Sequence, residues 1–277
     1  MNISLNKNKS IGKVLFIVEG AWTEAYVLRR IFTTIFDYQF ETILRQKGYK
    51  KYNSKENVTS QVFVINTEES NIQYIKKDNQ FLNNLFAELI ENYDFDMDNA
   101  AIYYLFDRDN KSNTDQLFVK DMVSVLVNAR DNEGYDRQGM LLLSYPSIES
   151  FTVSNFEEQS FHKAFAIGQD VKQYAHQMNY NHQRISEETL LHATKELLLA
   201  LQAIEQKEFD IDAYGDTSKK VFDFEEQEFQ DSGLYKILSL LKNHGIRRLL
   251  RKDGIKRLIM ICGANLNELW ENLIPRK

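Results

Sequence analysis

Short apolar runs alternate with amphipathic segments along the first half of the chain. Runs rich in β-branched and aromatic residues, too short to be helices, predict strands at residues 14–18, 61–66, 101–106 and 140–144. Apolar positions at helical spacing predict helices between and beside these runs, at residues 23–36, 81–93 and 117–129. The alternation of strand and helix predicts an α/β fold, with a parallel sheet and right-handed crossovers.

The pattern changes after about residue 150, where strand-like runs nearly vanish. Helical patterns at residues 186–207 and 227–242 dominate the rest, which predicts an α/β domain at residues 12–155 followed by a mainly helical region at residues 156–277. Ser186 and Thr189 have the spacing of a capping box but lack its acid. No linker rich in glycine or serine separates the halves, so we expect the helical region to pack on or beside the first domain.

Acidic residues follow three of the predicted strands. Glu19 and Glu24 follow the first strand, Asp107 and Asp109 the third, and Glu149 the fourth. The carboxyl ends of parallel strands form one crevice, so these carboxylates are expected to converge there. Carboxylate oxygens are the ligands that Mg²⁺ prefers. The sequence therefore predicts a divalent-metal site at this edge of the sheet.

Three of these acids also have a structural interpretation. Glu24 could favour the dipole of the helix that it begins. Asp107 could be a turn residue that leads into a polar loop, and Glu149 could cap the helix that follows Pro146. Their joint position at successive strand ends favours the functional interpretation.

Composition restricts the setting of the protein. The single cysteine, Cys262, cannot form an internal disulfide, which suits the reducing cytoplasm. No run reaches the roughly 18 to 20 apolar residues that cross a bilayer, and the polar start of the chain has no apolar segment of a signal peptide. We therefore expect a cytoplasmic protein without a membrane partner. The net charge of −6 decides little, because metal-binding carboxylates contribute to it.

Two further features bear on function. None of the five histidines forms an HExxH pattern, and the phosphate-binding glycine motifs of ATPases and dinucleotide-binding proteins are absent from the sequence. A basic segment near the end of the chain is a candidate nucleic-acid-binding surface, formed by Arg247, Arg248, Arg251 and Lys252. A solvated helix face or a contact with an acidic partner subunit is the alternative interpretation of this segment.

Three motifs resemble known elements of one fold. Residues 19–26, EGAWTEAY, resemble the EGxxTExxY element that opens the Toprim domain of RloB-like proteins. Residues 107–109, DRD, resemble the DxD element of the same domain, and Ser147-x-Glu149 is similar to the SxE element of OLD-family nucleases. The resemblance covers residues 12–155 and implies a Toprim domain, a Rossmann-like parallel sheet flanked by helices.

The resemblance implies a metal-dependent nuclease with Glu19, Glu24, Asp107, Asp109 and Glu149 as catalytic residues. Asp107 and Asp109 project to one side of an extended segment, and with Glu19 they would hold one Mg²⁺ or Mn²⁺ ion. By resemblance to OLD-family nucleases, the second ion would be held by Glu24, Ser147 and Glu149.

The same comparison implies a role in antiphage defence or abortive infection, beside an ABC- or SMC-type ATPase encoded nearby. The alternative is a catalytically silent Toprim subunit that binds or regulates such an ATPase or a nucleic acid. The sequence does not decide between DNA and RNA as the substrate. It also leaves the oligomeric state open, including a homo-oligomer.

Overall fold

The chain forms two compact units, which we describe separately. The computed structural model describes residues 4, 5, 7, 11–20, 22–43, 48–66, 79–95, 97, 99–107, 126–129, 139–144, 147–163, 165 and 168–205. The first unit, the sheet unit, comprises residues 10–106 and 112–142. The second comprises residues 1–9, 107–111 and 143–277, and we call it the α5–α7 unit after its described helices. The predicted domain limits at residues 12–155 and 156–277 stay a prediction.

Among the described residues, seven strands form one sheet in the order β2-β3-β4-β1-β5-β7-β6. The central strand, β1, pairs in parallel with β4 on one side and β5 on the other. The β2–β3, β3–β4 and β6–β7 pairs are antiparallel, so the sheet is mixed rather than wholly parallel. The strands are β1 (Lys13–Val18), β2 (Gln39–Thr42), β3 (Tyr49–Asn53), β4 (Gln61–Asn66), β5 (Ala101–Asp107), β6 (Val127–Asn128) and β7 (Gly139–Ser144).

This arrangement confirms the α/β class and the four predicted strands, but three strands were not predicted. Strand β2 is largely exposed at the edge of the sheet, and β3 carries two lysines, so neither shows the apolar run that marks β1 and β5. The helix predicted at residues 117–129 is wrong at its end. Residues 127–128 form β6, which pairs with β7, while residues 117–125 lie outside the described residues.

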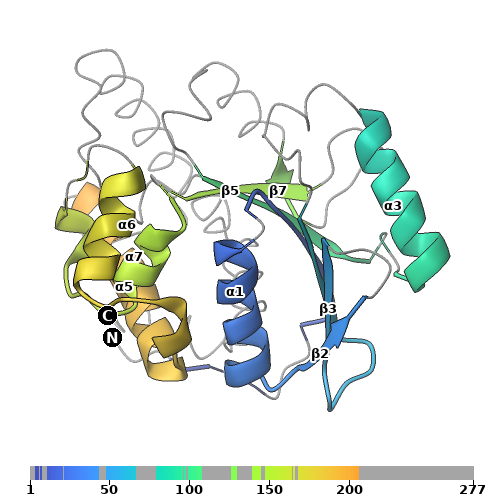
Figure 1. Ribbon diagram of the computed structural model, residues 1–277, viewed down its shortest axis with the longest axis horizontal. Helices are drawn as coiled ribbons and strands as arrows, with labels where there is room; N and C mark the ends of the chain where they lie inside the picture. The colour runs from blue at the N-terminus through green and yellow to red at the C-terminus, as the bar shows by residue number, and fades with distance from the viewer. Residues whose placement is uncertain are drawn as a thin grey trace, which may run out of the picture. The chain divides into compact units, whose positions relative to one another are not determined.

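Aromatic side chains form the core on both faces of the sheet. On one face Phe16 stacks on Tyr103 of the neighbouring strand, with ring centroids 5.5 Å apart. Phe32, in the π-helical turn Ile31–Ile35, lies 5.7 Å from Tyr52 on that face. On the other face Phe63 lies 4.8 Å from the ring of Phe95. Helices α1 (Thr23–Arg30) and α3 (Asn79–Tyr93) accordingly lie on opposite faces of the sheet (Figure 1). Burial on both faces explains the unbroken apolar runs of the central strands.

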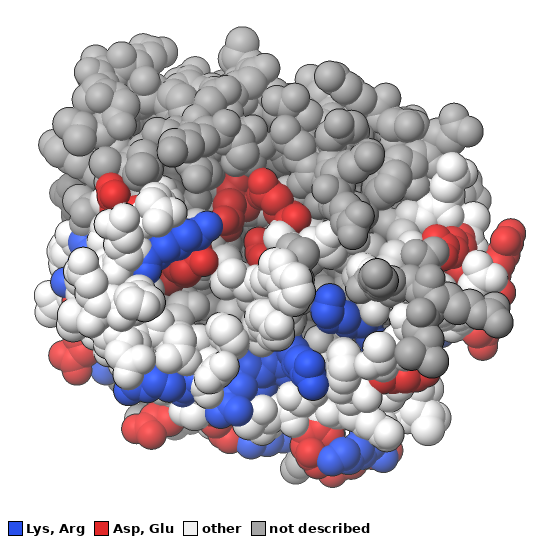
Figure 2. Space-filling view, viewed as in Figure 1, with Lys and Arg blue, Asp and Glu red and all other residues white. Residues whose placement is uncertain are grey.

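Helix α1 presents one face to the sheet and the other to solvent. Ala25, Val27 and Leu28 are buried, whereas Tyr26 and Arg29 are exposed. An acid lies in the first turn and two arginines in the last, which suits the helix dipole at both ends. Lysine and arginine side chains gather over the C-terminal end of this helix (Figure 2). The exposed face is therefore basic at that end.

The α5–α7 unit is helical throughout its described elements after residue 148. Its helices are α5 (Glu149–Ser154), α6 (Gly168–Gln177) and α7 (Glu187–Glu205), with 3₁₀ turns at Ser160–His162 and His182–Arg184. One buried cluster of this unit is formed by Val153, Val171 and Ala175, against which Tyr174 and Tyr180 pack. The predicted helix at residues 227–242 lies outside the described residues, so the helical region over its full length stays a prediction. No helix in the described part of the chain has the length and apolar character needed to cross a membrane.

Helix α7 begins with a reciprocal cap. The backbone N–H of Thr189 donates to Ser186 Oγ at 3.3 Å, and the N–H of Ser186 donates to Thr189 Oγ1 at 2.9 Å. Thr189 thus takes the place of the glutamate or glutamine of a capping box, and both N–H groups find acceptors. The helix predicted from residue 186 therefore begins where the sequence spacing placed it.

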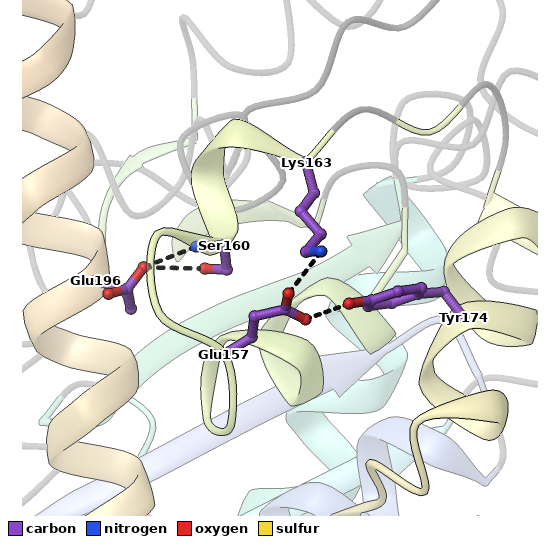
Figure 3. A network of polar contacts seen from close by, with 5 residues as sticks. All are labelled: Glu157, Ser160, Lys163, Tyr174 and Glu196. Carbon is purple, nitrogen blue, oxygen red and sulfur yellow. Dashed lines mark hydrogen bonds and ion pairs between the residues drawn. The ribbon is translucent and has the colours of Figure 1, made fainter.

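Two carboxylates hold the segment between α5 and α6 (Figure 3). Glu196 of α7 is only 2% exposed and accepts hydrogen bonds from both the backbone N–H and the hydroxyl of Ser160, at 2.9 and 3.3 Å. Glu157 accepts from the Tyr174 hydroxyl at 2.5 Å and lies 2.6 Å from Lys163 Nζ. The contact with Glu157 is the main cause that raises the pKa of Lys163. These bonds tie the loop to two helices.

Replacing Glu196 with alanine should destabilise the α5–α7 unit, because the change removes the acceptor of both Ser160 bonds inside the protein. We expect a loss of about 1–3 kcal/mol in the free energy of unfolding, measured by urea denaturation with circular dichroism. Lys195→Ala, at an exposed position of the same helix, is the matched control and should stay within about 0.5 kcal/mol of the parent. An equal effect of the two changes would contradict the prediction.

Candidate functional site

Glu19 follows the central strand and is held through its backbone. Its N–H donates to the carbonyl of Leu105 at 3.1 Å, so the pairing of β1 with β5 continues one residue past the strand. The side-chain amide of Asn66, at the end of β4, donates to the Glu19 carbonyl at 3.3 Å. Both neighbouring strands therefore fix the position of Glu19, whose side chain is half-buried. Asn66 was not among the predicted site residues, although it ends an apolar strand as the acids do.

Glu24 turns back toward the start of α1. It is 4% exposed, and its Oε1 accepts a hydrogen bond from the Gly20 N–H at 3.2 Å. A Cβ atom at position 20 would collide with this carboxylate, so a larger residue there would require the Glu24 side chain to move. The carboxylate lies at the N-terminal end of the helix, where negative charge is favourable. The structural role considered for Glu24 is thus present in the fold.

A second group of candidate ligands belongs to the α5–α7 unit. Asp107 Oδ1 accepts a hydrogen bond from the backbone N–H of Ile148 at 2.8 Å, immediately before α5. Ser147 and Glu149 flank Ile148. Asp107, at the end of β5, is thereby brought to the segment that carries the other two predicted ligands, and we call Asp107, Ser147 and Glu149 the Asp107 cluster.

The Asp107 cluster contains buried oxygen atoms without a hydrogen-bond partner. Ser147 is 1% exposed, and within the described residues neither its Oγ nor Glu149 Oε2 makes a hydrogen bond. Lys172 of α6 has its Nζ 4.0 Å from Glu149 Oε2, beyond hydrogen-bond distance. Leaving such groups unsatisfied costs about 1–3 kcal/mol each. An occupant that accepts electron density from hydroxyl and carboxylate oxygens would remove this cost.

Hard divalent cations have this property, so the cluster fits Mg²⁺ or Mn²⁺ by its donor atoms. Histidine, cysteine, aspartate and glutamate do not form a group of three that could hold a metal within the described part of the chain. The cluster supplies two carboxylates and one hydroxyl. Asp109, predicted as a further ligand, lies outside the described residues, as do Arg247, Arg248, Arg251 and Lys252. Their roles stay predictions.

Lys172 was not anticipated from the sequence. It lies on the exposed side of α6, and only the packing of α6 against α5 brings its ammonium group toward Glu149. No local pattern in the sequence signals such a contact. Lys172 supplies a positive charge near Glu149, although at 4.0 Å it leaves Oε2 without a hydrogen bond.

Comparison of the chain with protein-family models, curated proteins and solved structures finds no match. The interpretation of the two groups of residues therefore rests on their geometry and chemistry.

The hydrogen bond from Ile148 predicts different effects for two changes at Asp107. Asp107→Ala removes the acceptor at the start of α5 and should lower the free energy of unfolding by about 0.5–2 kcal/mol. Asp107→Asn keeps Oδ1 as an acceptor and should cost less. Urea denaturation in EDTA measures both effects without a contribution from metal. Glu158→Ala, at an exposed position of the same unit, is the control, and equal stability of the two Asp107 variants would contradict the prediction.

Proposed function

We propose that the chain is a metal-dependent nuclease with a Toprim-like domain, which uses Mg²⁺ or Mn²⁺ to cleave phosphodiester bonds in DNA or RNA. The observation that carries the proposal is the Asp107 cluster, in which buried Ser147 and Glu149 oxygens lack hydrogen-bond partners beside a third potential ligand. The motif resemblance adds independent support, because all three cluster residues belong to Toprim-like elements.

The resemblance to Toprim domains implies that Glu19 and Asp107 serve one metal centre. The parallel pairing of β1 with β5 extends to Val18 and Leu105. Glu19 follows Val18 directly, and Asp107 comes two residues after Leu105. The carboxyl ends of neighbouring parallel strands open onto one crevice, where ligands bind in α/β sheets. Each residue thus comes at or directly after the end of one of two neighbouring parallel strands, as the resemblance would require of these ligands.

The chain's residues would divide their roles as follows. Asp107 and Glu19, with Asp109, would hold one ion, and Ser147 and Glu149 would hold the other. Glu24 would join the second ion by giving up its contact with Gly20, or would stay in place and orient the turn. When bound, the two ions would offset the negative charge that develops on the attacking and leaving oxygens of a diester. Glu19 could alternatively handle the proton of the attacking water or of the leaving oxygen.

A binding or regulatory subunit is the second candidate function. The observation that favours it is that Glu24 and Asp107 both accept backbone hydrogen bonds, from Gly20 just before α1 and from Ile148 at the start of α5. Carboxylates with these roles could be retained for the fold alone. In either case the resemblance supports a cytoplasmic role in antiphage defence with an ABC- or SMC-type ATPase.

Cleavage by the purified chain tests the two functions against each other. We expect labelled DNA or total RNA to be cut with Mg²⁺ or Mn²⁺ present, alone or beside the ATPase encoded nearby, and not in EDTA. Asp107→Asn, Ser147→Ala and Glu149→Gln should abolish cutting and should also remove the metal-dependent rise in melting temperature, since a ligand of the native state stabilises it.

Glu158→Gln is the control and should behave as the parent, because this acid is exposed and lies outside the cluster. Metal-induced stabilisation without cutting, in the presence of the ATPase, would assign the chain to the binding function. If the metal neither stabilises the protein nor supports cutting, the proposed metal site is contradicted.

Glu19→Gln should reduce turnover by at least about 100-fold, the lower end for loss of a positioned acid or base. The change keeps the size of the side chain and leaves the backbone bonds of Glu19 intact, so the fold should be unaffected. Calorimetric titration with Mn²⁺ separates the two roles. Weaker metal affinity would mark Glu19 as a ligand, whereas unchanged affinity would mark it as the group that handles the proton. A near-normal rate would give Glu19 a structural role only.

A further inference from the structure

The exposed face of α1 carries aromatic and basic side chains in a row. Trp22, Tyr26, Arg29 and Arg30 are spaced so that they share one face of the helix. Trp22 and Tyr26 are 69% and 40% exposed, and their rings stack with centroids 6.0 Å apart. Large exposed aromatic residues are uncommon on a surface that contacts only water. We call these four residues, together with Lys50 of β3, the α1 strip.

The basic end of the α1 strip contains positive charges that no described carboxylate neutralises. Lys50 lies close enough to Arg29 for their charges to interact, and burial together with this repulsion lowers the pKa of Lys50. Neither residue forms an ion pair with a carboxylate in the described part of the chain. The nearby lysines differ, since Lys51 lies 3.7 Å from Glu41 and Lys55 lies 2.6 Å from Asp37. An anion near Arg29 and Lys50 would relieve their repulsion.

The arginines are held by side-chain contacts on the same surface. The Arg29 guanidinium lies over the ring of Phe40, 4.3 Å from its centroid, and Arg30 Nη1 donates to Thr34 Oγ1 at 3.3 Å. Their positions are therefore partly fixed before any ligand binds, which reduces the entropy lost on binding. The strip covers about 12 Å from Trp22 to Arg30, at about 1.5 Å per residue of helix.

We propose that the α1 strip binds single-stranded nucleic acid, with bases stacked on Trp22 and Tyr26 and phosphates held by Arg29, Arg30 and Lys50. Aromatic platforms beside a row of cations are how proteins bind single strands without reading sequence. A base in a duplex is stacked within its own helix and cannot lie on an exposed ring, so the surface favours unpaired strands. The row of cations complements the phosphate backbone in charge.

This inference deepens the proposed function and rests on it for one step. Trp22 lies between Gly20 and Glu24, so a strand bound along α1 would have one end beside the proposed metal ligands. The substrate of the nuclease would then be single-stranded DNA or RNA, or the unpaired part of a structured RNA. Binding itself requires no metal and can be measured apart from cleavage.

Fluorescence anisotropy in EDTA tests the proposal, using labelled 12-nucleotide dT and rU strands and a 12-base-pair DNA duplex. We expect the full chain to bind a single strand more tightly than the duplex, and the dT and rU arms distinguish DNA from RNA. Trp22→Ala should weaken single-strand binding at least about fivefold, the lower range for loss of one stacked base. Arg29→Gln combined with Lys50→Gln should reduce the slope of log affinity against log salt by about 1.4, or about 0.7 for each cation.

Two control variants separate these effects from general changes of the surface. Ile90→Ala removes an exposed apolar side chain of α3, and Lys195→Gln removes an exposed charge of α7. Both should bind as the parent does. Because the chain has two tryptophans, Trp270→Phe leaves Trp22 as the remaining one, and its fluorescence should be quenched when the dT strand is added.

Unchanged affinity in Trp22→Ala and an unchanged salt slope in the double variant would overturn the proposal. A changed sedimentation coefficient in either variant, with unchanged affinity for the strands, would also overturn the proposal and would indicate that the α1 strip is a protein–protein interface. If the strip variants bind strands as the parent does and still cleave with metal present, the nuclease function is supported and the role of the α1 strip is contradicted. If the α1 strip binds single strands but the chain shows no metal-dependent cleavage, the binding proposal is supported and the nuclease function is contradicted.

Discussion

The parallel pairing of β1 with β4 and β5 is the constraint on which the sheet unit depends. All three strands are buried on both faces, so their positions leave room only for apolar and aromatic side chains along their length. Polar residues can appear only where the strands end, and there they appear on all three. Glu19, Asn66 and Asp107 come at or directly after these ends, and the backbone of Glu19 is tied to both neighbouring strands.

Backbone N–H groups just before α1 and at the start of α5 add a second constraint, because they need acceptors. Glu24 provides one for Gly20, and Asp107 provides one for Ile148. The same carboxylates are candidate metal ligands, so their oxygens can either accept these backbone hydrogen bonds or coordinate a metal ion. Ser147 and Glu149 differ in having buried oxygens that make no hydrogen bond with a described residue. These two residues, more than the acids that accept backbone hydrogen bonds, distinguish a metal site from a purely structural role.

The sequence predicted the parts of the fold in which burial produces a clear pattern. Runs buried on both faces identified β1, β4 and β5, and helical spacing identified α1, α3 and α7. It missed β2 and β3 because their lysines and glutamate lie on a sheet surface, where an exposed strand resembles a loop. Candidate ligands could be chosen from their place after strands, but the bond between Asp107 and Ile148 and the approach of Lys172 to Glu149 depend on contacts between distant segments. No local pattern encodes such contacts.

The two faces of helix α1 differ in their surroundings, because one packs against the sheet and the other is exposed to solvent. Its buried residues pack against the sheet, and Phe32 in the following turn contacts both Phe16 and Tyr52. This packing fixes the rotation of the helix about its axis. Trp22 and Tyr26 must then point away from the sheet, and Arg29 follows them on the same side. The spacing that buries one face of α1 therefore also aligns the aromatic and basic side chains of the other.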